Sequence, residues 1–509
     1  MSYIKAFFII AVLCIFNNIF AQQLSTGKRQ HIRTLIVFFD GLRPDYIIPE
    51  QMPNLYAFKQ TAAYGKKHHS VFPTVTRVNA SSYATGSYPA SHGILGNAVY
   101  FPAVNKTQPL NTGSIADMKK AKDAEHGQLL TAVSVGELLA KAGEKMMIFS
   151  SGSTGQAFLQ NHTISGGAII NTDTILPVAM QENVWNVIGK APADLPDNRA
   201  RHRWITDALF HFGFAVDGPL VSAIWYSDPD GAAHDNGIGS PEAVESIKVA
   251  DEQFGRIISY LKEHNLQSKY NIIVSADHGF VTYAGKESLT DFLIQQKFKK
   301  DKLSDDIVVA EGAIYVKDHN PQIITAIVKS LQQQEWVGAV FTKGKKRGDM
   351  QGFVPGTLSF ESVHWDHPTR SGDILVDKNW NDNKNDKGYA GTSFSKGVAG
   401  HGSISPYEIH IALIASGPSF KKSFESDMPT SNVDIVPTIL YINKIKGSEK
   451  MNGRVMTELL SGNNIPILKP KPGIITTQTK INNVNYKLSL YRTTVGKNVY
   501  VDYAGVKRD

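Results

Sequence analysis

The sequence contains very little cysteine and no apolar run of full membrane-spanning length. Its only cysteine is Cys14, near the N-terminus of the 509 residues. The net charge is also small, because 53 Lys and Arg residues are nearly balanced by 46 Asp and Glu residues. These features exclude a disulfide-rich scaffold, and no nucleic-acid-binding surface is evident. With 42% hydrophobic residues, the composition excludes a disordered, collagen-like or coiled-coil chain.

The N-terminus has the pattern of a secretory signal peptide. Lys5 precedes an apolar stretch over residues 6–15, and the small residue Ala21 follows a polar patch. We therefore predict a signal peptide over residues 1–21, cleaved after Ala21, and a periplasmic or secreted mature protein without a stable membrane span. An uncleaved membrane anchor is the alternative. Cleavage would remove Cys14 and leave no thiol to act as a nucleophile or metal ligand.

Short strand patterns alternate with helical patterns along the chain. The segment 241–262 has apolar residues at steps of three and four behind a Ser-Pro start, which predicts a helix. Further helices are predicted over 134–142 and 433–441, and buried strands over 34–39, 220–226, 271–276 and 409–415. This alternation predicts an α/β fold in which helices cover both faces of a mostly parallel central sheet.

Residues 286–395 differ from the rest of the chain in composition. They are richer in Lys, Gln, Asn and Asp, and their strand and helix patterns are shorter. We predict that they form a smaller cap insertion, which divides the catalytic core into residues 22–285 and 396–509. Alternating residues over 484–490 and 499–503 are suited to closing strands near the C-terminus.

Aspartate and histidine residues cluster around the ends of the predicted strands. They are Asp40, Asp230, His234, Asp277 and His278, which follow or end strands, and His401, which precedes the last strand. Taken singly, such an Asp is typical of a turn or helix cap. In open α/β sheets, however, ligands bind beyond the carboxyl ends of the strands. Carboxylates and imidazoles suit zinc, with manganese as a lesser option, and this set exceeds the needs of one tetrahedral ion, so we predict two metals.

A Thr- and Ser-rich segment completes a recognisable order of motifs. Residues 72–81 include Thr76, and Gly96-Asn97 follows about twenty residues later. Together with Asp40, Pro229-Asp230 and its histidine, Asp-His-Gly and a late Gly-His-Gly, these motifs resemble the alkaline phosphatase superfamily. The most similar branch is the nucleotide pyrophosphatase/phosphodiesterase family, and the resemblance extends over residues 34–418.

The resemblance implies a site and a reaction. Thr76 would be the nucleophile, and Asn97 would donate its side-chain amide to a phosphoryl oxygen. One zinc ion would be held by Asp40, Asp277, His278 and Thr76, and the other by Asp230, His234 and His401. The enzyme would be a secreted hydrolase that cleaves phosphodiester or pyrophosphate bonds of small nucleotide-type substrates through a phospho-threonine intermediate. Departures from the family pattern, such as Val75 in place of Lys, leave the metal set intact and the substrate open.

Two alternatives use the same site. A phosphonoacetate-type phosphonate hydrolase or a phosphomonoesterase would share the metals and the threonine, and Lys106, Lys119 and Lys120 would then serve a dianionic substrate or simply be solvated. A sulfatase is disfavoured because it requires a modified Cys or Ser in a different motif. A non-catalytic binding protein is disfavoured because the whole ligand set and Thr76 are present.

Several assignments remain open at the level of sequence. Thr74, Ser81 and Ser82 are alternative hydroxyls that rank below Thr76. Aromatic residues such as Trp225, Tyr226 and Phe280 could either stack on a nucleotide base or fill the core, and the sequence does not distinguish these roles. The oligomeric state is also open.

Overall fold

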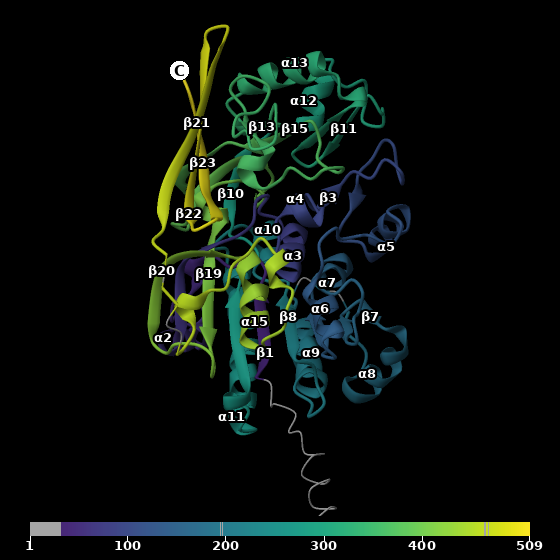
Figure 1. Cartoon of the computed structure of the whole chain (residues 1–509), viewed down its shortest axis with the longest axis vertical. Helices are drawn as coiled ribbons and strands as arrows, with labels where there is room; N and C mark the ends of the chain where they lie inside the picture. Colours follow the sequence, from purple (N-terminus) through teal and green to yellow (C-terminus); the bar gives the residue numbers. More distant parts are fainter. Residues whose placement is uncertain (1–31, 194, 196, 463–464, 467) are drawn as a thin grey trace, which may run out of the picture. The chain divides into compact units, whose positions relative to one another are not determined.

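The computed structural model describes residues 32–193, 195, 197–462, 465–466 and 468–509 (Figure 1). The predicted signal peptide over residues 1–21 and the cleavage after Ala21 lie outside these residues. None of the helices in the described ranges is long and apolar enough to cross a membrane. Residues 33–509 form a single unit by their contacts.

A nine-stranded sheet lies at the centre of the fold. In spatial order its strands are β20 (Phe424–Ser431), β2 (Ala63–His69), β19 (His410–Ser416), β9 (Tyr270–Ser275), β1 (Arg33–Phe39), β8 (Val221–Tyr226), β5 (Met146–Ser150), β6 (Ala168–Asn171) and β7 (Thr174–Leu176). Only β19 and β7 run antiparallel to the other strands of this sheet. The predicted mostly parallel sheet is therefore confirmed.

Alternate residues of β1 pack into two different hydrophobic cores. Leu35, Val37 and Phe39 belong to one core, and Ile36 and Phe38 belong to the other, as the pleat of a strand requires. The first core is covered by α2 (Pro53–Thr61), α8 (Gln181–Ile188), α9 (Arg199–Ala208) and α11 (Pro241–Glu263), and the second by α3 (Thr76–Thr85), α5 (Ile115–Ala124), α6 (Val135–Lys141), α7 (Thr154–Gln160) and α15 (Ile435–Ile442). Helices thus cover both faces of the sheet, as predicted.

The predicted helices of the core and strands of the central sheet agree with the structure to within two residues at every end. The helix predicted over 241–262 is α11, and Ser240 caps it by accepting a hydrogen bond from the Ala243 N–H. The helix predicted over 134–142 is α6, which begins with a capping box between Ser134 and Glu137. These local signals were sufficient because each cap satisfies its own helix end.

Much of the predicted cap insertion forms a second sheet with its own hydrophobic core. The sheet contains β11 (Ile307–Ala310), β12 (Ala313–Val316), β15 (Ile374–Lys378), β13 (Val337–Thr342) and β14 (Leu358–Ser359), accompanied by α12 (Leu289–Gln295) and α13 (Pro321–Gln332). A third sheet joins β16 (Trp380–Lys384), β17 (Ala390–Lys396), β10 (Val281–Gly285) and β18 (Ala399–Gly400). The boundaries 286 and 395 themselves stay a prediction.

The C-terminal strands are longer than the sequence pattern indicates. They are β22 (Val484–Val495) and β23 (Asn498–Arg508), and they pair with the unpredicted β21 (Lys471–Ile481) in a separate antiparallel sheet. β21 escaped the prediction because most of its residues are exposed and lack apolar alternation. The remaining short α-helices and strands are α4 (Pro89–His92), β3 (Ala98–Val99), β4 (Leu110–Asn111), α10 (Asp230–Asn236) and α14 (Pro406–Ile409).

Candidate active site

The fold brings the predicted aspartates and histidines to one edge of the central sheet. Asp40 directly follows β1, and Asp277 and His278 follow β9. β19 runs antiparallel to β9, so its beginning lies at the carboxyl end of β9, and His401 stands shortly before it in the chain. The six aspartates and histidines predicted as ligands therefore converge from separate segments, as the strand-end argument requires.

One group of possible ligands is built on α10. Asp230 and His234 are four residues apart on this helix, which places both side chains on one face. Asp230 Oδ1 lies 3.3 Å from His234 Nε2 and 3.2 Å from His401 Nε2. Two ligands about 2.0 Å from a tetrahedral zinc ion are themselves separated by roughly 3.3 Å. These separations therefore suit a shared metal ion.

The second group is more deeply buried. His278 Nε2 lies 3.0 Å from Asp277 Oδ2 and 3.5 Å from Asp40 Oδ1. The Thr76 hydroxyl oxygen lies 3.3 Å from the same nitrogen. β9 ends at Ser275, so the backbone beyond it is free to turn and present Asp277 and His278 to one point. Asp230 also belongs to a cluster with Asp40 and His278, so the two groups adjoin.

The histidine rings are all oriented so that Nε2 points toward carboxylates. Each Nδ1 lies at hydrogen-bond distance from a backbone carbonyl oxygen, at 3.0 Å for His234, 3.0 Å for His278 and 2.8 Å for His401. A carbonyl only accepts, so each Nδ1 must carry the hydrogen, and in a neutral ring Nε2 has a lone pair. This is the orientation in which proteins present histidine to metals.

The carboxylates of this site lack hydrogen-bond donors on the oxygens that point toward the histidines. These buried oxygens without a donor are Asp40 Oδ1, Asp230 Oδ1 and Asp277 Oδ2. Lone pairs of neutral imidazoles and of carboxylates repel, so a proton or a metal ion must lie between them. The residues present therefore fit divalent ions with nitrogen and oxygen ligands, zinc above all.

The pKa values show how strongly the site depends on compensating positive charge. Burial, followed by the nearby charges of Asp277 and Asp230, raises the pKa of Asp40 well above its usual value. Burial alone would raise the pKa of Asp230 as well, but the adjacent imidazoles of His234 and His401 outweigh burial and lower that pKa. Bound cations would keep the carboxylates ionised, because they supply the opposite charge at close range.

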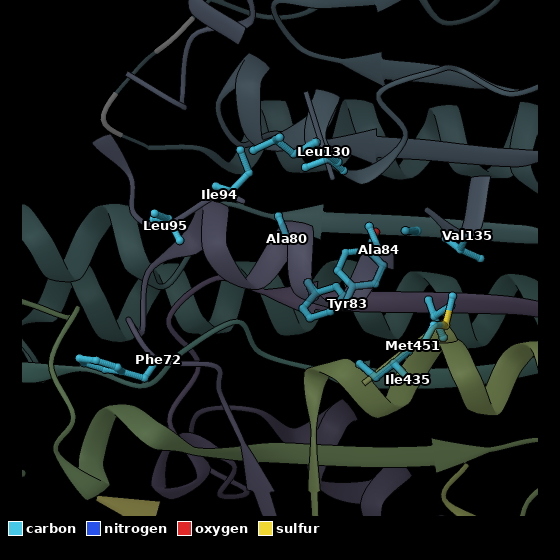
Figure 2. Close-up of a cluster of buried hydrophobic side chains, with 14 of the residues drawn as sticks. Phe72, Ala80, Tyr83, Ala84, Ile94, Leu95, Leu130, Val135, Ile435 and Met451 are labelled. Atoms are coloured by element: carbon cyan, nitrogen blue, oxygen red, sulfur yellow. The ribbon is translucent and has the colours of Figure 1, made fainter. Parts of the chain in front are cut away.

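Thr76 is the hydroxyl that reaches the ligand groups. It is the first residue of α3 and is buried, and α3 is fixed by apolar contacts of Ala80, Tyr83 and Ala84 with other segments of the core, as Figure 2 shows. The alternative hydroxyls are engaged or placed elsewhere. Thr74 donates to the Ser403 carbonyl, Ser82 bonds to His92, and Ser81 is completely buried.

Asn97 is held beside the nucleophile by two hydrogen bonds. Its Oδ1 accepts from the backbone N–H of Arg77 at 3.1 Å, and its own backbone N–H donates to Glu311 Oε2 at 2.9 Å. An N–H must be paired with the oxygen of the side-chain amide, so the amide nitrogen lies on the other side. Because Asn97 also lines the cleft described next, this nitrogen is available to a bound molecule.

A cleft of about 560 Å³ adjoins the histidine cluster. Its lining includes Asn97, His234 and His401 of the site, together with Lys378 and Lys396 from the predicted cap insertion or its boundary. Sites for small ligands typically measure roughly 300–1,000 Å³. The cleft therefore has room for a substrate larger than a single phosphate group.

Other residues considered from the sequence lie elsewhere. Lys106, Lys119 and Lys120 are exposed and do not line this cleft, which matches solvated surface residues. Trp225, Tyr226 and Phe280 are buried in the core. The Trp225 indole N–H nevertheless donates to Asp40 Oδ2 at 3.0 Å and so orients a predicted ligand.

Sequence reasoning missed the groups that orient the ligands. Glu311 comes from the turn between β11 and β12, more than two hundred residues from Asn97. The carbonyls that bind each Nδ1 belong to Thr74, Gly279 and Ala399. A backbone carbonyl has no sequence signal, and the partner of Asn97 depends on contacts distant in the chain, so neither was predictable.

Comparisons with known proteins all point to the same family. The model of the type I phosphodiesterase / nucleotide pyrophosphatase family matches residues 34–389. The Xenopus laevis bis(5'-adenosyl)-triphosphatase enpp4 is 25% identical over 441 residues, which cover 85% of this chain and 82% of that protein. The Rattus norvegicus ectonucleotide pyrophosphatase/phosphodiesterase family member 1 is 24% identical, and its match covers 77% of this chain but 39% of that protein.

Solved structures show the same fold. An inactive variant of murine ectonucleotide pyrophosphatase/phosphodiesterase 5 in complex with AMP superimposes with a TM-score of 0.57 and 18% identity, covering 84% of this chain and 100% of that chain. A mutant of alkaline phosphatase PafA gives a TM-score of 0.62 and 18% identity, covering 84% of this chain and 98% of that chain. The predicted alkaline phosphatase-like α/β fold is therefore confirmed.

Proposed function

The chain belongs to the type I phosphodiesterase / nucleotide pyrophosphatase family, and from that premise we propose that it is an exported two-metal hydrolase. It cleaves phosphodiester or pyrophosphate bonds of small nucleotide-type substrates through a phospho-threonine intermediate. The observation that supports this most directly is the position of the Thr76 hydroxyl, 3.3 Å from His278 Nε2 and beside buried carboxylates. A hydroxyl in such surroundings is suited to act as a nucleophile.

Two sets of side chains would hold the metal ions. Asp230, His234 and His401 form one set, and Asp40, Asp277, His278 and Thr76 form the other. Bound zinc would supply Lewis-acid stabilisation of negative charge and would lower the pKa of a ligated hydroxyl. The unpaired carboxylate oxygens and the orientation of the histidines support this assignment.

Thr76 and Asn97 have complementary roles in the reaction. A bond forms between the Thr76 oxygen and phosphorus while the bond from phosphorus to the leaving oxygen breaks. The Asn97 amide donates to a phosphoryl oxygen, because its Oδ1 is already occupied by the Arg77 N–H. Hydrolysis of the phospho-threonine then restores the hydroxyl, and two successive in-line displacements give net retention of configuration at phosphorus.

Two lysines that line the cleft, Lys378 and Lys396, are suited to the part of the substrate that does not react. Lys378 donates to the Glu287 carbonyl at 3.1 Å, and burial lowers its pKa to about 8, although Asp377 acts in the opposite direction. It is therefore still mostly protonated at neutral pH. Lys378 and Lys396 also suit a second anionic group, which favours a phosphonoacetate-type phosphonate hydrolase or a phosphomonoesterase as the second candidate.

A substrate panel separates these candidates. Zinc-loaded protein should hydrolyse nucleotide diesters and dinucleotide pyrophosphates with a higher kcat/KM than monoesters or phosphonoacetate. Lys378→Met tests the lysines that line the cleft, and Lys106→Met is its control because Lys106 is exposed outside the cleft. A preference for phosphonoacetate or monoesters would establish the second candidate. Binding of these compounds without any turnover would instead indicate a non-catalytic binding protein.

Export has its own test. The n-region, the apolar stretch and Ala21 predict that the mature chain begins near Gln22 in the periplasm or outside the cell. Mass spectrometry of the protein recovered from those compartments should show loss of residues 1–21. Recovery of the mature enzyme with residues 1–21 intact would contradict cleavage and favour the uncleaved anchor.

A further inference from the structure

A second cluster of histidine and carboxylate groups lies where β23 meets the central sheet. His69 is the last residue of β2, His410 is the first residue of β19, and the two are register partners across these antiparallel strands. Asp502 comes from β23. One ligand atom from each of the three residues lies within 4.8 Å of the others. The cluster shares no residue with the candidate active site.

The hydrogen bonds of His69 repeat the pattern of the active-site histidines. Its Nδ1 lies 2.9 Å from the Thr430 carbonyl oxygen, so Nδ1 carries a hydrogen. Its Nε2 lies 2.9 Å from Asp502 Oδ1, and an ionised carboxylate oxygen only accepts. The neutral ring would direct a lone pair at the carboxylate, so a proton or a metal ion must lie between the two atoms. The 2.9 Å separation is close to the roughly 3.3 Å between two ligands of a tetrahedral zinc ion.

His410 favours the metal over the proton. A proton on His69 would satisfy the pair with Asp502 but would leave His410 beside an imidazolium, its ring centroid 5.0 Å away. His410 is partly buried beside His69, and its neutral ring offers a lone pair. Within the described part of the chain, neither ring nitrogen of His410 makes a hydrogen bond to another residue. A metal ion would be coordinated by one of these two nitrogens.

The Asp502 carboxylate is also oriented by a hydrogen bond, as metal-binding carboxylates usually are. Thr493 donates its hydroxyl hydrogen to Asp502 Oδ2 at 2.8 Å, which leaves Oδ1 to point toward His69. Outer partners of this kind, on the histidine and on the carboxylate, fix the orientation of metal ligands.

We propose that His69, His410 and Asp502 form a third metal site, separate from the candidate active site, that binds a zinc-class divalent ion. Two imidazoles and one carboxylate supply three protein ligands, and a water molecule would complete a tetrahedral shell. Because its ligands come from β2, β19 and β23, the ion would fasten the C-terminal sheet to the central sheet. The site is therefore structural, and hydrolysis does not depend on it.

The test compares zinc content among matched variants. His410→Phe keeps a ring beside His69 but removes the lone pairs, and Asp502→Asn removes the charge. His264→Phe is the control, because His264 also stacks on an aromatic ring, Tyr260, but is exposed. After saturation with zinc and removal of excess, elemental analysis should find one equivalent fewer in the first two variants than in the wild type and the control. Turnover should remain at the wild-type level, which also reports correct folding.

Two further readouts make the outcome decisive. The rise in Tm on adding zinc to the metal-free protein should be smaller in His410→Phe than in His264→Phe. Native mass spectrometry of the wild type should find three zinc ions per chain, a count that does not require any variant to fold. Equal zinc content in His410→Phe and wild type, or no more than two ions in the wild type, would overturn the proposal and leave a protonated His69–Asp502 pair.

Discussion

Asn97→Ala should slow the chemical step without removing the metals. The Arg77 N–H binds Asn97 Oδ1 at 3.1 Å, so the amide nitrogen is the part of Asn97 available to the substrate. Loss of one preorganised donor to a developing negative charge typically lowers kcat about 10²–10³-fold, or ~2.7–4 kcal/mol. We expect a loss of this size in kcat and kcat/KM, because the bond is stronger in the transition state than in the ground state.

The assay is steady-state hydrolysis of a nucleotide diester by zinc-loaded protein, with zinc content measured on the same samples. Asn97→Asp keeps an oxygen for the Arg77 N–H but replaces the donor with an acceptor, so it should lose at least as much activity as Asn97→Ala. Glu311→Gln is the control, since Glu311 binds the Asn97 backbone N–H rather than its side chain, and Gln retains an acceptor there. A loss of kcat/KM below about 3-fold in Asn97→Ala, under 1 kcal/mol, would refute the reasoning.

Three further predictions concern metal binding, packing and pH. His401→Ala should lower the zinc affinity of one site by more than about 100-fold, as measured by competition with a chelator. The affinity of the other site should stay nearly unchanged, because Asp40, Asp277 and His278 remain. Equal weakening of both sites would contradict two separate ligand sets. Phe38→Ala should lower the free energy of unfolding by about 3–5 kcal/mol, since Phe38 is fully buried and stacks on Trp225, and urea denaturation measures this. Burial, with smaller effects of His367 and Arg370, lowers the pKa of His92 from 6.5 to about 3, so on acidification the unfolded chain takes up the proton first. Stability should then fall below pH 6.5 by up to ~1.4 kcal/mol per pH unit until about pH 3, and urea denaturation at pH 7 and pH 5 should find a smaller loss in His92→Asn.

The sequence was most informative where structure is set by local signals. The apolar runs that became β1, β8 and β9 are fully buried strands, and the Ser-Pro start of α11 fixed its first residue. The order of the strands in space and the reversed direction of β19 were not predictable, because they depend on pairing between distant segments.

The candidate site likewise has features that the sequence predicts and features that it does not. The identities of Asp40, Asp230 and the other ligands could be proposed because their residue types and their positions after strands carry chemical meaning. The helix that aligns Asp230 with His234 was not predicted, since Asp-Gly-Ala-Ala-His is short and reads equally well as a loop. The indole of Trp225 was considered for stacking but instead binds Asp40, which only the paired register of β1 and β8 could show.

The central claim is that the Thr76 oxygen attacks phosphorus, and Thr76→Ala tests it most directly. Asp40, Asp277 and His278 keep their charges and positions in this variant, so zinc content should stay at the wild-type level. Turnover should fall roughly 10³-fold or more, because the attacking atom is gone, while Thr76→Ser should retain more activity. Hydrolysis of a diester that is chiral at phosphorus by the wild type should proceed with net retention of configuration. Inversion of configuration, or wild-type turnover in zinc-loaded Thr76→Ala, would contradict a phospho-threonine intermediate.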